Sequence, residues 1–447
     1  MKNNRRNFIK TTAGASTAIV VGGILPGFSA LNYRRIIGSN ENVRVSVIGV
    51  NSRGYDLARN FANQPNCDVA HVCDVDSRAI EKCIKGVKKN QELKVKGYGD
   101  LRKSLESKDI DAVIIATPDH WHATASLLAM QAGKHVYVEK PCSHNPKEGE
   151  ILVEAAKKYK KVVQMGNQRR SRPNVIKGIE ELKNGAIGRA YFGKSWYTNN
   201  RSSIGKGKEA VPPSWLDWDL WQGPAPRKAY KDNIVHYNWH WFWHWGTGEA
   251  LNNGVHMIDL LRWGFGVDYP IRVSSNGGRY RYQDDWQTPD TQIINIDFKE
   301  GITMTWEGKS CNGTPVEGSR VGAMFYGENG TLLLSGGNSY IIFDLDGNIV
   351  REVKNDFNIN ERNRANTSQN LDALHIQNFL SAILYGEKLK ADISSGHKST
   401  LLVQLGNIAQ RVGRSLEIDP NTGHIFNDKE ANLLWSREYE KGWEIKL

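Results

Sequence analysis

The chain has 447 residues, 39% hydrophobic and 24% charged, which is enough for one large or two ordinary globular domains and excludes a fully disordered protein. The formal net charge of +11 does not indicate a nucleic-acid partner, because six basic and no acidic residues lie in 1–40 and the other basic residues are scattered. Five cysteines without a C-x-x-C pair do not form the pattern of a disulfide-stabilised scaffold.

The N-terminal residues have the pattern of an export signal. Two adjacent arginines, Arg5 and Arg6, precede an uncharged stretch over 11–33 that is rich in alanine, valine, isoleucine and glycine. This pattern is typical of a twin-arginine (Tat) signal, although a membrane anchor or an ordinary basic terminus is the alternative. We therefore expect a signal over 1–30, a linker over 31–41 and a periplasmic protein. Glycines and a proline disfavour a stable membrane span, so tethering is expected only if the signal is uncleaved.

Residues 42–168 alternate short apolar segments with amphipathic ones. Strands are expected over 43–50, 68–75, 110–117, 135–138 and 162–165, and helices over 55–63, 77–89, 123–132 and 146–160. Regular β-α-β alternation predicts a doubly wound parallel sheet, the Rossmann type of α/β domain.

Residues 169–415 have a different rhythm, with many separate strand patterns. These strands are expected over 191–197, 271–276, 292–298, 302–307, 321–326, 331–335 and 340–344, followed by helices over 372–385 and 395–414. We predict an α+β domain with a large, mostly antiparallel sheet that binds substrate and supports oligomerisation. Residues 416–447 form a C-terminal extension.

The loop between the first strand and the first helix resembles a dinucleotide-binding fingerprint. Gly49 and Gly54 occupy the outer positions of G-x-G-x-x-G, and Asn51 replaces the middle glycine. Gly49 permits a tight turn, Gly54 permits close packing of helix on strand, and the helix N-terminus favours a diphosphate. The cofactor-binding residues predicted in this loop are Gly49, Asn51, Ser52, Arg53 and Gly54.

Asp74 ends the next strand, 25 residues after Gly49, at the spacing of an acid that binds ribose hydroxyls. Its carboxylate favours NAD, whereas nearby Arg78 leaves NADP open. An ordinary helix N-cap is the alternative role for Asp74.

Three further segments lie where ligands of parallel sheets bind, or contain acid–base groups. They are 116–122, Glu139-Lys140-Pro141 and 248–263. Together with Trp218-Asp219-Leu220-Trp221-Gln222-Gly223-Pro224 and Gly254-Val255-His256, they resemble the Gfo/Idh/MocA family over about residues 42–415. Members of this family bind NAD(P) and oxidise or reduce hydroxyl groups on sugars and inositols.

The resemblance implies that Lys140 holds the substrate hydroxyl and that His256 is the acid or base. The family usually has Asp four residues before this histidine, and this chain has Asn252. Independently of the resemblance, a group that titrates near neutral pH suits proton removal during hydride transfer. A buried structural histidine and a solvated lysine are the alternatives. Four more residues, together with Lys140 itself, are predicted to face the cofactor: Thr117, Pro118, His122 and Glu139.

Two of the clusters among the 14 tryptophans fall over 215–221 and 239–245. Indole rings stack on sugar rings, so some of these tryptophans are expected in the substrate pocket. The other predicted substrate contacts are Arg169, Arg170, His240, Trp241, His244 and Glu249. His240 and His244 suggest a metal site only weakly, because no recognised ligand motif accompanies them, and no metal is predicted.

Three functions follow from these features. The main reading is an NAD(P)-dependent sugar or polyol oxidoreductase with a tightly held cofactor, because free NAD is scarce outside the cytoplasm. The first alternative is a redox-neutral glycosidase or lyase that works through a transient keto-sugar. The second is a non-catalytic sugar or nucleotide sensor, suggested by Asn51 and Asn252. The resemblance also implies a homo-oligomer.

Overall fold

The computed structural model describes residues 42–355 and 364–447, and Val43–Leu447 form one unit in it. The export signal predicted over 1–30 and the linker over 31–41 lie outside the described residues. Within the described ranges, no helix is both long and apolar enough to cross a membrane.

The first sheet is parallel and has the strand order β3-β2-β1-β4-β5-β6. Its strands are β1 Val43–Ile48, β2 Cys67–Cys73, β3 Lys96–Tyr98, β4 Ala112–Ile115, β5 His135–Val138 and β6 Val163–Met165. The connecting helices are α3 Arg53–Ala62, α4 Ser77–Val87, α5 Leu101–Leu105, α6 Asp119–Gln131 and α7 Pro146–Tyr159. The order reverses direction between β1 and β4, which places a ligand crevice at their carboxyl ends. The predicted doubly wound sheet is confirmed.

The element boundaries differ from the prediction where the apolar pattern and the backbone disagree. β1 ends at Ile48 because Gly49 turns the chain with a φ of 80°, a left-handed conformation that glycine adopts without strain. β3 and α5 were missed because three and five residues are too short to show a periodic pattern. α6 begins at Asp119, four residues earlier than expected.

The second sheet has nine strands in the order β14-β13-β12-β11-β7-β10-β9-β8-β15. They are β7 Ala190–Thr198, β8 Arg272–Gly278, β9 Thr291–Phe298, β10 Ile302–Lys309, β11 Val321–Gly327, β12 Gly330–Ser335, β13 Tyr340–Phe343, β14 Ile349–Val353 and β15 Leu416–Glu417. Among the described strand pairs of this second sheet, only β7–β10 is parallel, which confirms the mostly antiparallel sheet. β14 was missed because its side chains are mostly exposed and carry no buried apolar alternation.

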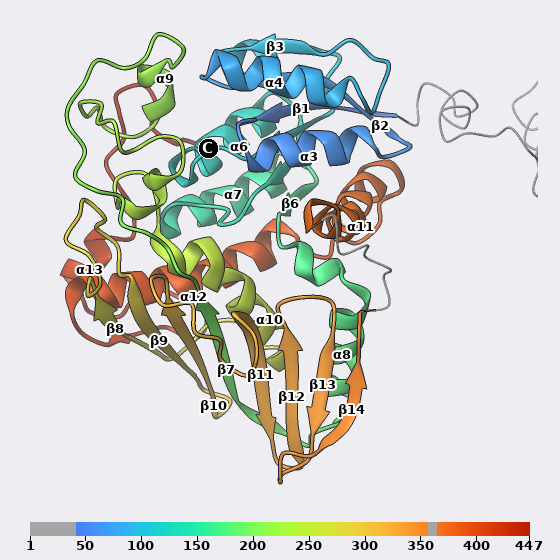
Figure 1. Cartoon of the computed structure of the whole chain (residues 1–447), viewed down its shortest axis with the longest axis vertical. Helices are drawn as coiled ribbons and strands as arrows, with labels where there is room; N and C mark the ends of the chain where they lie inside the picture. Colours follow the sequence, from blue (N-terminus) through green and yellow to red (C-terminus); the bar gives the residue numbers. More distant parts are fainter. Residues whose placement is uncertain (1–41, 356–363) are drawn as a thin grey trace, which may run out of the picture. The chain divides into compact units, whose positions relative to one another are not determined.

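Helices α8 Pro173–Lys183, α10 Val255–Phe265 and α12 Ile393–Val412 pack on the second sheet. α10 and α12 lie on the side of it that faces the first sheet, and α8 lies beside β12 and β13 (Figure 1). α12 also contacts α7, so the two sheets share an intervening helical layer. The remaining elements are η1 Gln168–Ser171, α9 Trp218–Gln222, η2 Asn238–Trp241, η3 Ala250–Gly254, α11 Arg364–Tyr385 and α13 Lys429–Leu433.

Late segments of the chain complete the core of the first sheet. Phe379 of α11 packs edge-on against Phe61 and Tyr137, with ring centroids 6.3 and 5.8 Å away. Trp443 of the C-terminal extension lies 5.0 Å from Trp121 of α6. Burial of these rings therefore ties the end of the chain to the first sheet.

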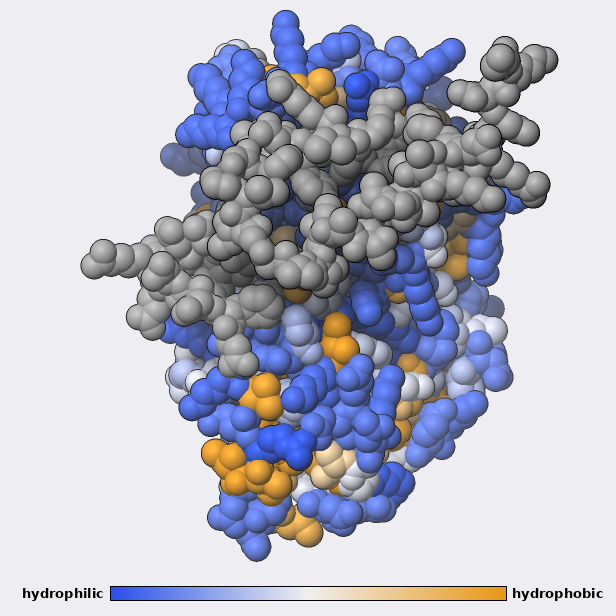
Figure 2. All heavy atoms as spheres, turned by 90° about the vertical axis from the view of Figure 1, so that its right-hand side faces the viewer, coloured by the Kyte–Doolittle hydropathy of each residue, from blue (hydrophilic) through white to orange (hydrophobic). Residues whose placement is uncertain are grey.

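The described surface is mostly hydrophilic on the side drawn in Figure 2, with a hydrophobic group toward its lower end. Exposed Leu345, Ile349 and Val350 belong to the β13–β14 hairpin of the second sheet.

Candidate active site

A cavity of about 370 Å³ lies at the carboxyl ends of the first sheet and is lined on its other side by residues of the second half of the chain. Thirteen predicted site residues line it together: Gly49, Asn51, Ser52, Arg53, Asp74, Thr117, Pro118, His122, Glu139, Lys140, His240, Asn252 and His256. These residues come from loops more than 200 positions apart, so the fold brings the predicted nucleotide loop and the predicted acid–base groups to one place.

The glycine loop has no room for side chains at its two ends. A Cβ on Gly49 would lie 2.7 Å from the Ala116 carbonyl oxygen, and one on Gly54 would lie 1.8 Å from the Gly49 oxygen. Gly54 therefore packs against the loop instead of lining the cavity. This close approach of loop, helix and strand is the geometry that leaves α3 N–H groups free for a diphosphate.

Asp74 holds the same loop from the end of β2. Its Oδ2 accepts a hydrogen bond from the Val50 amide at 2.7 Å, and its Oδ1 accepts from the Asp76 amide at 2.9 Å. Burial raises the pKa of this carboxyl. Asp74 is not the N-cap of α4, because Asp76 caps that helix through the Arg78 amide.

Arg78 and Arg53 have partners that sequence reasoning did not identify. Arg78 pairs with Asp76 at 2.8 Å and stacks 3.3 Å from the Trp215 ring centre, so its guanidinium is already engaged. Arg53 pairs with Glu139 at 2.8 Å and with Asp372 at 2.5 Å. Arg53 thus links α3 to the end of β5 and to α11, and it holds the pKa of Glu139 low against the effect of burial.

Thr117 and His122 brace the strand ends that carry the site. His122 Nδ1 lies 2.6 Å from the Pro141 carbonyl oxygen, and Nε2 lies 2.8 Å from that of Thr117. The imidazole therefore bridges the loops that follow β4 and β5, and its Nδ1 contact is with the residue after Lys140.

Lys140 is held by the helix that precedes His256. Its Nζ donates to the Asn252 carbonyl oxygen at 2.8 Å and to Asn252 Oδ1 at 3.2 Å. Asn252 Nδ2 in turn donates to Glu249 Oε1 at 3.3 Å, and Arg201 pairs with Glu249 at 2.6 Å. Burial lowers the pKa of Lys140, and Glu139 and Asp119 oppose this effect.

Asn252 and His256 do not share a regular α-helix. Asn252 lies in the π-turn η3, and His256 lies in the first turn of α10. Such single π-turns are frequent at functional sites. Both side chains nevertheless line the cavity.

His256 is buried, and its Nδ1 has no hydrogen-bond partner in the part of the chain that the structure describes. Burial, together with Arg169 and Lys140, lowers its pKa well below the ordinary value. The imidazole is therefore neutral near pH 7, and one of its two ring nitrogens carries a lone pair that can accept a proton.

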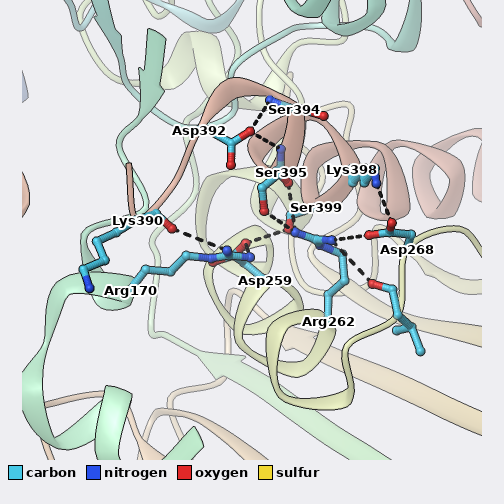
Figure 3. A network of polar contacts seen from close by, with 11 residues as sticks. Arg170, Asp259, Arg262, Asp268, Lys390, Asp392, Ser394, Ser395, Lys398 and Ser399 are labelled. Atoms are coloured by element: carbon cyan, nitrogen blue, oxygen red, sulfur yellow. Dashed lines mark hydrogen bonds and ion pairs between the residues drawn. The ribbon is translucent and has the colours of Figure 1, made fainter. Parts of the chain in front are cut away.

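Several predicted substrate contacts lie outside the cavity wall. Arg170 is buried in an ion pair with Asp259, with N–O distances of 2.7 and 2.8 Å, inside the polar network of Figure 3. Trp241 is stacked on Trp286 with ring centroids 3.9 Å apart. Both side chains are buried and have their partners within the protein, so their contacts are structural.

The remaining three predicted contacts are also behind or beside the wall. His244 faces a separate cavity of about 470 Å³ and lies 2.7 Å from the Pro226 oxygen. Glu249 supports Asn252, as described above. Arg169 is half-buried and is not among the residues that line the cavity of Lys140 and His256. His240 and His244 thus face different cavities, and no group of three or more metal-ligating side chains occurs among the described residues.

A long segment over 199–247, here called the strap, covers the nucleotide end of the cavity. Its Leu220, Trp221, His236, Tyr237, Trp239 and His240 line the same cavity as Asp74. Two backbone hydrogen bonds attach it to the first sheet, from Asp217 to the Val75 oxygen at 3.0 Å and from Ser77 to the Trp215 oxygen at 3.1 Å. His236 Nε2 adds a contact to Asp76 Oδ2 at 2.8 Å.

The two tryptophan clusters noted in the sequence fall in this segment. Most of its rings form an apolar cluster that contains Trp218, Trp221, Trp239 and Trp245. Trp121, Trp221 and Trp239 also line the cavity. The strap is therefore a folded cover with its own core, and only part of its aromatic surface faces a ligand.

A Rossmann crevice with a glycine loop, an acidic residue after β2 and a lysine–histidine pair defines an NAD-binding oxidoreductase fold. The family model described as "Oxidoreductase family, NAD-binding Rossmann fold" matches residues 43–167. The model described as "Oxidoreductase family, C-terminal alpha/beta domain" matches residues 216–418. The chain belongs to the Gfo/Idh/MocA oxidoreductase family.

Curated relatives carry glycosidase names. A glycosyl hydrolase family 109 protein of Saccharopolyspora erythraea is 28% identical over 253 residues, which cover 51% of this chain and 55% of the relative. An alpha-N-acetylgalactosaminidase of Shewanella oneidensis is 28% identical over 215 residues, which cover 43% of this chain and 46% of the relative. The chain thus spans about half the length of these relatives.

Solved structures share the fold at low identity. A levoglucosan dehydrogenase in complex with NADH has a TM-score of 0.66 at 17% identity, over 85% of this chain and 99% of that one. The WlbA dehydrogenase of Bordetella pertussis, in complex with NADH and UDP-GlcNAcA, has a TM-score of 0.62 at 17% identity with the same coverage. These neighbours agree with the NAD-binding architecture.

Proposed function

We propose that this chain transfers a hydride between NAD and a hydroxyl-bearing carbon of a sugar, glycoside or polyol. One observation carries the proposal: Lys140 of the first domain and His256 of the second line the same cavity as the Gly49 loop. Hydride transfer needs a nucleotide crevice, a cation near the substrate oxygen and a proton acceptor, and these are the three groups present.

The residues around the crevice fit a dinucleotide. The Gly49–Gly54 turn leaves no space for a Cβ, and the buried Asp74 carboxyl lies at the end of β2 where ribose hydroxyls bind. Gly49, Asn51 and Ser52 would hold the diphosphate, and Asp74 would hold the ribose. Because Arg78 is engaged by Asp76 and Trp215, it is not available to a 2′-phosphate, which favours NAD over NADP.

When bound, NAD accepts a hydride from the substrate carbon or returns it. The Lys140 ammonium donates a hydrogen bond to the substrate oxygen and stabilises negative charge that develops there. Neutral His256 accepts the hydroxyl proton through a free ring nitrogen. Asn252 orients Lys140, and Glu249 orients Asn252. The names of the NADH-bound neighbours, a levoglucosan dehydrogenase among them, support a sugar substrate.

A second candidate is a redox-neutral glycosidase or lyase, and the strap favours it. Oxidation of a ring hydroxyl acidifies the neighbouring C–H bond. A base then removes that proton, and the aglycone leaves with the electrons of its C–O bond as a C=C bond forms in the sugar. In a glycosidase, water adds to this bond, whereas a lyase leaves it in place, and in both the hydride returns to the carbonyl carbon. This cycle needs no external oxidant, so it suits a cofactor enclosed by the strap and a protein exported as we propose from residues 1–30. The glycosidase names of the curated relatives support the same reading.

Purified protein incubated with chromogenic glycosides separates the candidates. Under the dehydrogenase reading, a sugar reduces the bound nicotinamide, and turnover needs an external acceptor. Under the redox-neutral reading, the aglycone is released with no added NAD and no acceptor. A protein that binds sugars but gives neither signal would be a sensor, and turnover that disappears in Lys140→Ala or His256→Ala excludes that reading.

A further inference from the structure

The segment that follows β6 contains an unusual concentration of unsatisfied polar atoms. Both amide atoms of Asn167, Oε1 of Gln168, and Nε of Arg169 and Arg172 are buried without a hydrogen-bond partner among the described residues. Asn167 is 1% exposed and Arg172 is 9% exposed. Such atoms lose their hydrogen bonds to water without replacement, so native proteins keep only a few of them unless a ligand or an ion supplies the partner.

The same segment has more cations than carboxylates to balance them. Arg170, the middle of three arginines, is neutralised by Asp259. Arg169 and Arg172 face only Asp372 among the described carboxylates, and Asp372 is already paired with Arg53 at 2.5 Å. Burial, together with repulsion by Arg172, lowers the pKa of Arg169 to about 9.

This positive region borders the reacting groups. Gln168 lines the cavity beside His256, and η1 packs against α10 and α11. Arg169 lies in η1 and Arg172 ends it, so both belong to the segment that packs against α10, the helix of His256. The Arg172 guanidinium is anchored because its NH1 donates to the Gly336 and Gly337 carbonyl oxygens, each at 2.8 Å.

We propose that the substrate is a sugar that carries an oxoanion (a carboxylate, a sulfate or a phosphate) and that Arg169 and Arg172 bind this group beside His256. The inference rests on the proposed function and specifies its substrate class. A guanidinium presents parallel N–H donors that match two oxygens of an oxoanion, so an arginine pair selects such a group over a hydroxyl. A neutral sugar would leave the two charges uncompensated.

Calorimetry and a reduction assay test this inference on the purified full chain. Glucuronate, a glucose sulfate and a glucose phosphate are compared with glucose as free ligands, and uronides with the matching neutral glycosides as substrates for reduction of bound NAD. The variants are Arg169→Gln, which removes the charge, and Arg169→Lys, which keeps the charge but lacks the parallel N–H donors of a guanidinium. Arg189→Gln is the matched control, because Arg189 is exposed and forms a surface ion pair with Glu328.

We expect the acidic member of a pair to bind about 10- to 100-fold more tightly than the neutral one, as for hydrogen bonds to charged groups. This preference should disappear in Arg169→Gln, weaken in Arg169→Lys and persist in Arg189→Gln. The acid that binds most tightly shows whether the group on the substrate is a carboxylate, a sulfate or a phosphate. Equal binding of neutral and acidic sugars, or an unchanged preference in Arg169→Gln, would overturn the inference. If the acids bind but no sugar reduces the bound NAD, the proposed function fails while the anion site stands.

Discussion

The Nζ atom of Lys140 donates to both oxygens of Asn252, the backbone carbonyl at 2.8 Å and the side-chain amide at 3.2 Å. The two residues are 112 positions apart and belong to different domains. This contact fixes the lysine at the junction of the nucleotide crevice and the helix that carries His256. It also explains how a neutral amide serves where the family usually has a carboxylate, because Glu249 orients the amide from the other side.

Replacing Asn252 with Asp should therefore impair the protein instead of restoring a family residue. The new carboxylate would face Glu249 at about the 3.3 Å now spanned by a hydrogen bond, and the repulsion plus lost bond should cost about 1–3 kcal/mol of stability. Thermal denaturation and kcat measure the effect. The double variant Asn252→Asp with Glu249→Gln removes the repulsion and should recover part of the loss. An Asn252→Asp protein as stable and active as the parent would refute the role given to Glu249.

Lys140→Ala and His256→Ala should each lower kcat by about 10²- to 10⁴-fold, the usual contribution of a positioned acid–base group. Neither side chain holds the glycine loop, so both variants should still retain nicotinamide, as mass spectrometry under native conditions would reveal. Arg189→Gln serves as the control for removal of a surface cation. Full activity in either alanine variant would assign the proton transfer to another group.

Both limbs of the pH profile of kcat/KM for sugar oxidation should lie at lower pH than exposed histidine and lysine side chains would give. The oxidation needs neutral His256, whose pKa lies well below 6.5, so the rate should hold on the acid side past the point where an exposed histidine becomes protonated. It also needs charged Lys140, whose pKa is lowered from 10.5 by burial, so the rate should decline at lower pH than an exposed lysine would give. An acid limb at the ordinary histidine value that persists in His256→Gln would contradict this assignment.

Loosening the strap should release the cofactor faster without changing the chemistry. In Asp76→Asn the amide keeps the helix cap but loses the charge that pairs with Arg78 and His236. Loss of NAD on dialysis should accelerate by about two- to tenfold, while kcat with excess NAD stays the same. Asp428→Asn is a matched control, since Asp428 also caps a helix and pairs with an arginine, Arg414, on the surface. Equal NAD retention in both variants would show that the contacts of Asp76 do not hold the strap over the cofactor.

The glycine loop provides a test of the nucleotide crevice. Gly49→Ala introduces a Cβ 2.7 Å from the Ala116 oxygen and forces a side chain into a φ of 80°, so the loop must move. Stability should fall by about 1–3 kcal/mol, and bound nicotinamide should be lost. Gly313→Ala is the control, because its nearest neighbour would be 3.4 Å away and its φ is unstrained. Undiminished NAD binding by Gly49→Ala would place the diphosphate elsewhere.

The sequence was informative where the chemistry is local. A continuous apolar run followed by glycines predicted β1, its turn and the crevice, because the buried parallel strand and the positive φ are properties of neighbouring residues. The family motifs named Lys140 and His256, which the fold brings to one cavity. The cover over that cavity was not predicted, because the strap's contacts with Val75 and Asp76 join residues more than 130 positions apart.

The arginines show most clearly what the sequence alone could not predict. Arg169 and Arg170 are adjacent and equivalent by sequence, yet Arg170 is neutralised by Asp259 in α10, 89 positions away, and Arg169 is not. Arg53, predicted in the phosphate loop, is shared between Glu139 and Asp372. Which cation is free depends on tertiary ion pairs, and no local pattern encodes these.

Mass spectrometry of the purified protein under native conditions tests the central claim most directly. The account predicts a population whose mass exceeds that of the chain by one NAD or NADH, and this mass should persist after extensive dialysis. A chain that carries no nicotinamide and takes up none when NAD is added would contradict the account.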